Sequence, residues 1–247
     1  SYYSNSVLGM SDGPAEGRIA ELLAPFAGDL LPGALEGYAL PVSDGSEANR
    51  RNTRAAIGLL AEAGYTVQDG VMTSESGEPL SIDILLTSGA TQMINVADLY
   101  VEALARVGVD AQVVTVDSAQ FKERTEAYDF DMTYYTRGLS LSPGNEQMLY
   151  WGCDGVETPG TRNLMGMCSP AAEAMIAAML TAESQDDFRA AVKALDRVLT
   201  TGRYVVPIWH SPVTRLAHKA WLHYPEDRVQ MYGDWIGFQP DVWWAER

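Results

Sequence analysis

Apolar positions recur along most of the chain, and their spacing changes from one stretch to the next. Residues 14–28 carry apolar side chains at helical spacing after a Ser-Asp-Gly-Pro start, which predicts an amphipathic helix. Residues 31–46 are rich in proline and glycine and predict an extended loop. A second helix is predicted over residues 49–63, with Gly64 as the residue that ends it.

The middle of the chain alternates between strand and helix patterns. Residues 71–73 and 80–87 flank a turn-forming stretch and predict a hairpin with a longer loop. The elements expected from residue 80 onward are a strand (80–87), a helix (90–107), a strand (109–116), a helix capped by Ser118 (118–127) and a strand (130–136). Strands separated by helices of this length predict a mainly parallel sheet with helical cover.

The last third of the chain is mostly helical before it becomes irregular. Helices are predicted over residues 170–183 and 186–201, followed by an apolar strand over 204–210. Pro207 within that strand favours an edge position or a bulge. The aromatic residues that follow predict no regular element.

The formal net charge of −16 limits the kinds of partner that the surface can bind. Nucleic acid and anionic lipid bind through lysine- and arginine-rich patches, so this composition argues against both. We interpret the acidic excess as a solvated surface. No apolar run approaches the roughly 20 residues that cross a bilayer, and the first residues lack the pattern of a signal peptide.

Residues that could carry catalysis or bind metal are few. His210, His218 and His223 could be combined into a metal site, but their spacing matches no standard helix or strand geometry. Asp129 and Asp131 flank one residue at the start of a predicted strand and would point to the same face. Paired acids can share a proton and act as acid and base, although a solvated strand end is the interpretation we prefer.

Two cysteines, Cys153 and Cys168, leave two interpretations open. They are either unrelated buried thiols or, in an oxidising compartment, a disulfide that closes a loop of about 15 residues. Neither has histidine partners at zinc spacing.

One segment resembles a binding surface on physical grounds. A predicted strand delivers Tyr134, Tyr135 and Arg137, and then breaks into a loop rich in Ser, Gly, Pro and Asn. Ligands of α/β sheets gather at the carboxyl ends of strands. Ser142 followed by Glu146 also indicates a helix N-terminus, which favours an anion, and Arg137 could grip a carboxylate. A capped helix with an exposed arginine is the alternative.

An ordered series of short motifs makes the chain recognisable. The series runs through Leu59–Tyr65, Gly77–Leu80, Leu104–Val109, Asp117–Phe121 and Asp129–Met132. It resembles the family 5 extracellular solute-binding proteins, the peptide and nickel receptors of ABC importers. Further stretches are similar to the Yej-type branch, associated with oligopeptides and microcin C: Asp117–Phe121, Leu139–Gln147, Tyr150–Gly152, Pro159–Leu164 and Leu195–Leu199.

The resemblance implies an α/β fold, the C-terminal lobe of a type II periplasmic-binding-protein-like fold, with a mixed sheet covered by helices. Residues 1–45 would lead from a first lobe, residues 46–203 would form the C-terminal lobe, and residues 204–247 would return toward the first lobe. Family members are usually more than twice as long and begin with a secretion signal, so we expect a C-terminal fragment with one wall of the ligand cleft.

The same resemblance implies a function. We expect a periplasmic protein that captures peptides or peptide-like solutes and delivers them to inner-membrane permease subunits. It implies no enzymatic activity, no cofactor and no metal, no nucleic-acid partner and no direct membrane insertion.

The residues expected to line the cleft follow from the binding segment and the resemblance. They are Tyr134, Tyr135, Arg137, Ser140, Ser142, Asn145, Arg162 and Asn163, with a loop-stabilising role left open for the last two. Trp151 and Trp209 could stack on ligand, but we favour the core for both. The periplasmic setting also favours a Cys153–Cys168 disulfide, which would staple the loop that carries Arg162.

Ser140 marks a departure from the familiar peptide receptors, in which an aspartate near this position accepts the free amino group of the peptide. A hydroxyl cannot balance an ammonium in a closed cleft. We therefore expect a ligand with a blocked or formylated N-terminus, or one that places its amino group elsewhere. Two other functions stay open: a sensory domain built on the same fold, and a hydrolase that uses Asp129 and Asp131 or His210.

Overall fold

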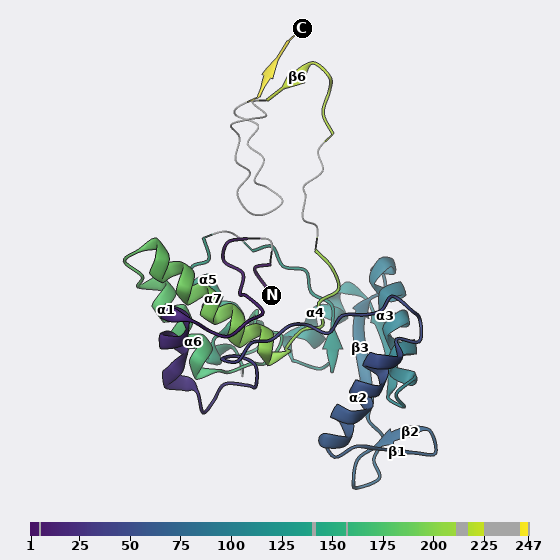
Figure 1. Ribbon diagram of the computed structural model, residues 1–247. Coiled ribbons are helices and arrows are strands. Elements are labelled where there is room, and N and C mark those ends of the chain that lie inside the picture. The colour runs from purple at the N-terminus through teal and green to yellow at the C-terminus, as the bar shows by residue number, and fades with distance from the viewer. Residues whose placement is uncertain (5, 140–141, 157, 211–216, 225–242, 247) are drawn as a thin grey trace. The chain divides into compact units, whose positions relative to one another are not determined.

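The computed structural model describes residues 1–4, 6–139, 142–156, 158–210, 217–224 and 243–246 (Figure 1). Contacts divide the chain into two compact units, one formed by residues 1–39 and 137–247 and the other by residues 40–136. The second unit is therefore one continuous segment, while the first is built from both ends of the chain. The roles expected for residues 1–45 and 204–247 as connections to another lobe stay predictions.

The continuous unit contains a small parallel sheet with helices. Its elements are α2 (Arg50–Glu62), β1 (Thr66–Gln68), β2 (Val71–Thr73), β3 (Ser81–Thr87), α3 (Thr91–Ala105), β4 (Asp110–Val116), α4 (Ser118–Glu126) and β5 (Met132–Thr133). The strand order is β4-β3-β5, and both pairings are parallel. The carboxyl ends of all three strands therefore lie at one edge of the sheet, as predicted from the alternation of strands and helices.

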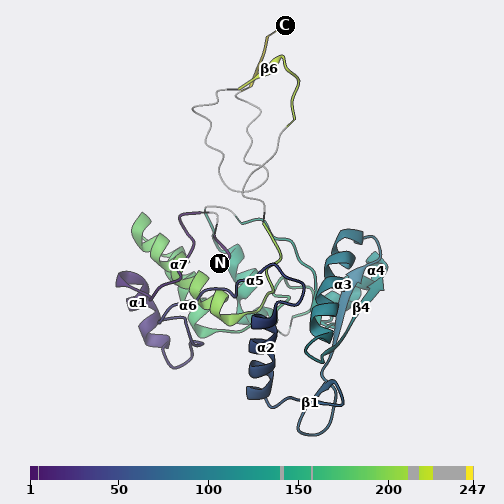
Figure 2. The ribbon, with the colours of Figure 1, turned by 45° about the vertical axis from the view of Figure 1, so that its right-hand side comes forward.

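The central strand β3 forms the core of this sheet because its middle residues are apolar on both faces. Ile84, Leu85 and Leu86 are buried, and α3 contributes Ala97 to the same cluster as Ile84 and Leu86. A run of apolar residues without alternation is typical of a strand covered on both sides. Figure 2 shows α3, α4 and β4 gathered together.

Helix α2 packs separately, beside the short hairpin β1–β2. Ala56 and Leu60 of α2 lie against the cluster formed by Met72, Val107 and Val109. Gly64 follows the helix with φ of 90°, the left-handed conformation that glycine adopts most readily and that was expected at this helix end.

Three local predictions in this unit need correction. Strand β2 pairs with β1, and the predicted hairpin with residues 80–87 is reduced to one bridge between Thr73 and Pro79. Helix α4 is capped by Asp117, whose Oδ1 accepts hydrogen bonds from the N–H groups of Ala119 and Gln120, and not by Ser118. Strand β5 spans only Met132–Thr133, because its pairing with β3 is limited to two residues.

The other unit is mainly helical within the described residues. Its elements are α1 (Gly17–Leu23), a 3-10 turn η1 (Ala24–Phe26), α5 (Glu146–Trp151), a 3-10 turn η2 (Cys153–Gly155), α6 (Pro170–Leu180), α7 (Gln185–Gly202), β6 (Leu222–His223) and β7 (Trp244–Ala245). Figure 1 shows the purple N-terminal helix α1 beside the green helices α6 and α7. The three helices share one apolar cluster that includes Leu23, Ile176 and Leu195.

Helix α7 also fastens the N-terminal segment through two buried charged residues. The carboxylate of Asp196 accepts hydrogen bonds from the backbone N–H groups of Tyr2 (2.7 Å) and Met10 (2.8 Å) and from the hydroxyl of Ser1 (2.5 Å). The next residue, Arg197, donates to the carbonyl of Gly13. Asp196 and Arg197 therefore attach the N-terminal segment, through Ser1, Tyr2, Met10 and Gly13, to helix α7.

The strand predicted over residues 204–210 is wrong. This segment has no regular secondary structure, and Val206, Ile208 and Trp209 are 53%, 49% and 78% exposed. Its apolar composition suits a strand, but no backbone partner among the described residues pairs with it. None of the described helices is both long enough and apolar enough to span a membrane.

Candidate functional site

Gln147 of α5 lies at the centre of a polar cluster in the discontinuous unit. Its side-chain Oε1 accepts hydrogen bonds from Arg137 Nη2 (3.0 Å), Tyr3 OH (3.3 Å) and Trp151 Nε1 (3.3 Å). Gln147 and Trp151 are four residues apart on α5 and both are buried, so the helix turns them to the same inner side. This arrangement fixes one end of the Arg137 guanidinium from within the protein.

Two guanidinium groups contact the same aromatic ring, that of Tyr150. The Arg137 Cζ atom lies 3.5 Å from the ring centroid, and the Arg162 Cζ atom lies 5.7 Å from it. Arg162 Nη1 also donates to the Tyr150 hydroxyl at 3.0 Å. Both distances are within the range of cation–π attraction. We refer to the five residues Arg137, Gln147, Tyr150, Trp151 and Arg162 as the arginine–tyrosine cluster.

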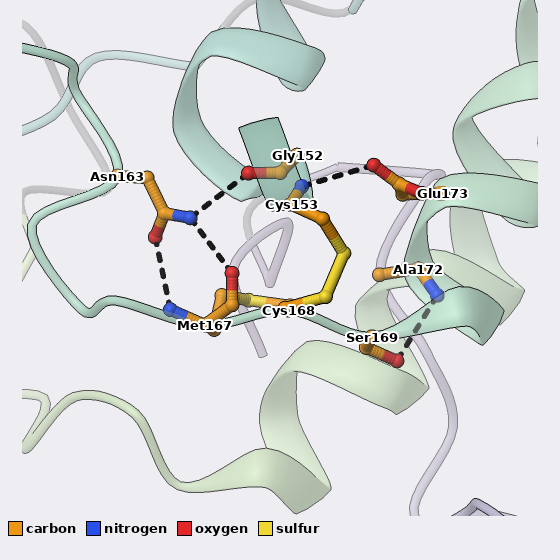
Figure 3. Close-up of a disulfide and its surroundings, with 8 residues drawn as sticks. All are labelled: Gly152, Cys153, Asn163, Met167, Cys168, Ser169, Ala172 and Glu173. Carbon is orange, nitrogen blue, oxygen red and sulfur yellow. Dashed lines mark hydrogen bonds between the residues drawn. A yellow bond between two sulfur atoms is a disulfide. The ribbon is translucent and has the colours of Figure 1, made fainter. Parts of the chain in front are cut away.

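The loop that carries Arg162 is closed by a disulfide between Cys153 and Cys168 (Figure 3). Inside it, the fully buried Asn163 side chain donates to the carbonyls of Gly152 (3.1 Å) and Met167 (2.7 Å). Its oxygen also accepts a hydrogen bond from Met167 N–H (3.2 Å). The amide of Asn163 thus joins the two ends of the loop beside the disulfide.

Helix α6 holds the same loop from outside. The Glu173 carboxylate accepts a hydrogen bond from the Cys153 N–H at 2.9 Å, and Ser169 caps the helix by accepting from Ala172 N–H. Figure 3 shows both contacts next to the disulfide. Arg162 therefore lies on a loop that the disulfide and the hydrogen bonds of Asn163 and Glu173 stabilise.

The sequence left open whether the helix N-terminus after Ser142 favours an anion or is an ordinary capped helix. Helix α5 begins only at Glu146 and has six residues. The Glu146 carboxylate accepts hydrogen bonds from Gly144 N–H (2.8 Å) and from Gln147 Nε2 (3.0 Å), so the helix entry is occupied by a carboxylate of the chain. Burial acts to raise the pKa of Glu146, but these hydrogen bonds, with Arg137 nearby, lower it overall.

Tyr134 and Tyr135 belong to the other unit, where they follow β5 at the carboxyl edge of the sheet. Their exposed fractions are 38% and 48%. Thr136 Oγ1 donates to the Tyr134 hydroxyl. The structure thus places two of the expected residues in one unit and Arg137 and Arg162 in the other.

The remaining expected residues are placed as follows. Ser142 and Asn145 are exposed, and Asn145 precedes α5 without a side-chain capping bond. Asn163 is buried and bonded within its loop, which supports the loop-stabilising role left open for it. Ser140 lies outside the described residues. Trp151 is buried as expected, whereas Trp209 is 78% exposed, so its predicted place in the core is wrong.

In the described part of the chain, the side chains considered for catalysis or metal binding do not come together in one site. Asp129 pairs with Arg124 at 2.7 Å, and Asp131 accepts a hydrogen bond from Asp83 N–H at 2.8 Å, so the two carboxylates have separate partners. Over the described ranges, His, Cys, Asp and Glu form no group of three that could hold a metal ion.

Sequence reasoning missed Gln147 and Tyr150, the two residues that organise the cluster. Their signal was weak but present: a glutamine four residues before a tryptophan on a short helix, with a tyrosine between two separated arginines. Only the folded chain brings Arg137 and Arg162 to that tyrosine.

Comparison with models of protein families shows the family to which the chain belongs. The family described as bacterial extracellular solute-binding proteins, family 5 Middle, matches residues 19–158, which is more than half of the sequence. The chain belongs to family 5.

Relatives in the same family include two proteins of Agrobacterium fabrum strain C58. One is named Peptidoglycan-binding protein YepA (34% identical over 248 residues, 100% of this chain) and the other Probable peptide-binding protein YejA (33% identical over 247 residues, 99% of this chain). The Escherichia coli K12 protein YejA is 27% identical over 250 residues. The chain spans 39% of the length of each Agrobacterium protein and 40% of the E. coli protein.

Solved structures show the fold. The periplasmic oligopeptide-binding protein from Thermotoga maritima, with bound mannohexaose, matches with a TM-score of 0.59 at 17% identity, over 83% of this chain and 35% of its own. The oligopeptide-binding protein AppA from Bacillus subtilis, with a nonapeptide, matches with a TM-score of 0.56 at 15% identity, over 81% and 39%. The expected α/β fold of type II periplasmic-binding proteins is thereby confirmed.

Proposed function

We propose that this chain belongs to the solute-binding component of an ABC importer that captures oligopeptides or peptide-like solutes. Membership of family 5 carries the proposal, because the relatives named for peptide and peptidoglycan binding are 33% and 34% identical across nearly all of this chain. The fold shared with AppA, which was crystallised with a nonapeptide, is in keeping with it. The protein would work in the periplasm and deliver its solute to permease subunits of the inner membrane.

Each unit supplies suitable chemistry for binding a ligand. In the unit of residues 40–136, the partly exposed Tyr134 and Tyr135 offer flat rings and hydroxyls. In the other unit, Arg137 and Arg162 offer charged donors for carboxylate or carbonyl groups. We include Ser140, Ser142 and Asn145 as polar lining and leave Asn163 to the loop. Residues of this kind recognise a peptide through hydrogen bonds and ring contacts, without covalent chemistry.

The hydrogen bonds of the carboxylates favour a binding role over hydrolysis. Asp129, Asp131 and Glu146 each accept hydrogen bonds from neighbouring protein groups. None of these contacts provides the nucleophile–base pair that acyl transfer requires. We therefore propose that the protein is not an enzyme.

The state of the ligand's N-terminus is a separate part of the proposal. Because Ser140 offers a neutral hydroxyl, we infer that the solute has a blocked or formylated N-terminus or places its amino group elsewhere. Binding of the full-length protein to matched formyl and free-amine peptides tests this point. A strong preference for the free amine would contradict it.

Native mass spectrometry of the full-length protein, purified without denaturation, tests the function itself. We expect an extra mass that is released as a peptide, and fragmentation then shows whether its N-terminus is blocked. A released saccharide, or an unchanged mass after incubation with a mixed peptide pool, would overturn the peptide proposal.

A further inference from the structure

Helix α2 carries three exposed arginines that form no ion pair with any carboxylate among the described residues. They are Arg50, Arg51 and Arg54. Asp44 and Glu47, in the loop before the helix, do not pair with them either. Elsewhere in the same unit, Lys122 and Arg124 each have an acidic partner. The charge of the three arginines is therefore left without a partner in the part of the chain that the structure describes.

The arginines are placed unfavourably for the helix itself. Arg54 follows Arg50 by four residues and Arg51 by three, so the three side chains lie on one side of the helix and repel one another. Arg50 and Arg51 also lie in the first turn, where the helix dipole is positive and where α2 has no acidic residue. This arrangement lowers the stability of the helix, and carboxylates from another molecule would remove the repulsion.

The side of α2 that carries the arginines is open. The helix has no fully buried residue, and Ala56 and Leu60 make its contact with the apolar cluster of Met72, Val107 and Val109. Ile57 lies one turn after the last arginine, on the same side, and is 39% exposed. A Cβ atom added at Gly58 would meet nothing within 4 Å. We refer to this side of the helix as the α2 outer face, formed by Arg50, Arg51, Arg54, Ile57 and Gly58.

We propose that the α2 outer face is a docking surface for an acidic segment of a partner protein. The unit of residues 40–136 contains 15 acidic and six basic residues, so most of its surface repels such a segment. Half of the basic residues lie on α2, and they attract it to one place and in one orientation. Each guanidinium can bind a carboxylate through two hydrogen bonds, and Ile57 offers an apolar contact between the acidic residues. The inference does not depend on the solute proposed above.

A membrane of anionic lipid is the other surface that arginines attract. A membrane is broad and flat, so it would also approach the acidic residues of the same unit, which repel the headgroups. A single protein segment can contact the arginines without approaching those acids. This difference favours the protein segment, and lipid vesicles enter the experiment as the alternative.

Fluorescence anisotropy of the full-length protein with labelled synthetic peptides tests the docking. The acidic peptide has Glu and Leu at helical spacing, and its control has Gln in place of every Glu. The proteins are the wild type, R51Q/R54Q, R51E/R54E and the control R106Q. Arg106 is an exposed arginine at the end of α3 that also forms no ion pair with a described carboxylate. Phosphatidylglycerol vesicles are the third probe.

We expect the acidic peptide to bind the wild type and R106Q equally, and the Gln peptide to bind both more weakly. R51Q/R54Q should weaken binding of the acidic peptide by about tenfold, since two ion pairs are lost, and R51E/R54E should weaken it further. Added salt should weaken binding to the wild type. Equal affinity of the acidic peptide for all four proteins, or no binding of it, would overturn the inference. Binding of the vesicles without binding of the peptide would assign the arginines to lipid and would overturn it as well.

Hydrogen exchange of the α2 amides, followed by mass spectrometry, gives a second measurement on the same proteins. With the outer face free, R51E/R54E should slow this exchange by about threefold or more, because acids replace bases near the positive end of the helix. The acidic peptide should slow it in the wild type, and R106Q should leave it unchanged. Faster exchange in R51E/R54E would mean that the full-length chain itself holds these arginines, and would overturn the docking surface.

Discussion

The carboxylate of Asp196 accepts a 2.7 Å hydrogen bond from the backbone N–H of Tyr2, 194 residues earlier in the chain. The same carboxylate accepts from Met10 N–H, and Asp196 has no exposed surface. A buried charge is tolerated where several donors surround it, and here backbone N–H groups supply two of those donors.

We expect Asp196→Asn to lower the free energy of unfolding by about 2–3 kcal/mol, because hydrogen bonds to a charged acceptor are lost and an amide N–H faces backbone donors. Urea unfolding followed by circular dichroism measures the change. Asp98→Asn, on the exposed side of α3, is the control and should stay within about 0.5 kcal/mol. Equal effects of the two substitutions would contradict the anchoring role.

Reduction of the Cys153–Cys168 disulfide should raise the intact mass by about 2 Da, as two thiols form. The chain-entropy estimate for a loop of this size is about 3 kcal/mol, so the double substitution C153A/C168A should lower stability by that order. Intact-mass analysis before and after reduction, followed by urea unfolding, gives both values. An unchanged mass on reduction would rule out the bond.

Asn163→Asp should be costly although the two side chains have the same shape. The new carboxylate would face the carbonyls of Gly152 and Met167, to which the asparagine now donates. We expect a loss of about 2–4 kcal/mol, since a charge is buried against acceptors. Asn95→Asp, at an exposed position of α3, provides the matched control. Thermal unfolding at pH 7 measures the melting temperatures of both variants. We expect that of Asn163→Asp to fall well below that of Asn95→Asp, and equal values would contradict the structural role of Asn163.

The stability of the fold should fall in alkali. Burial raises the pKa of Tyr2 and of Tyr3 above the ordinary tyrosine value of about 10, with Asp196 adding to the effect and Arg137 opposing it. Below pH 10 both states keep the phenol protons, and the contribution is complete. As the pH rises above 10, the unfolded chain releases these protons first, so unfolding becomes more favourable.

Two phenylalanine substitutions separate the contributions of the tyrosines. The buried Tyr2 hydroxyl has no hydrogen-bond partner among the residues that the structure describes, so Tyr2→Phe should be neutral or stabilising at pH 7 and should reduce the alkaline loss. Tyr3→Phe removes the bond to Gln147 and should cost about 1 kcal/mol at pH 7. Urea unfolding between pH 7 and pH 11 tests both, and an identical pH profile in all three proteins would contradict the assignment.

The elements with regular periodicity could be predicted from the sequence. Helix α7, helix α3 and strand β4 agree with their predicted positions to within about two residues, because their apolar stripes face a core that the chain itself provides. The order of strands and helices also led to the parallel sheet. These features depend on local sequence, so the local pattern of apolar residues was sufficient to predict them.

Features that depend on distant partners could not be predicted in the same way. Residues 204–210 have the composition of a strand, but strand pairing requires a second backbone. Asp117 and Ser118 are both good helix caps, and only the backbone conformation selects Asp117. Arg137 and Arg162 are separated by 25 positions, so their meeting at Tyr150 depends on the loop that Asn163 fastens.

The discontinuity of the first unit has a consequence for biosynthesis. Tyr2 leaves the ribosome 194 residues before the acid that binds its backbone, an interval of about 10–40 s at 5–20 residues per second. The continuous segment 40–136 can complete its sheet during that interval, because all of its strands are already available. Ser1, Tyr2 and Met10 therefore cannot make their contacts with Asp196 until α7 emerges, and we expect the segment that carries them to be open to chaperones or proteases throughout that time.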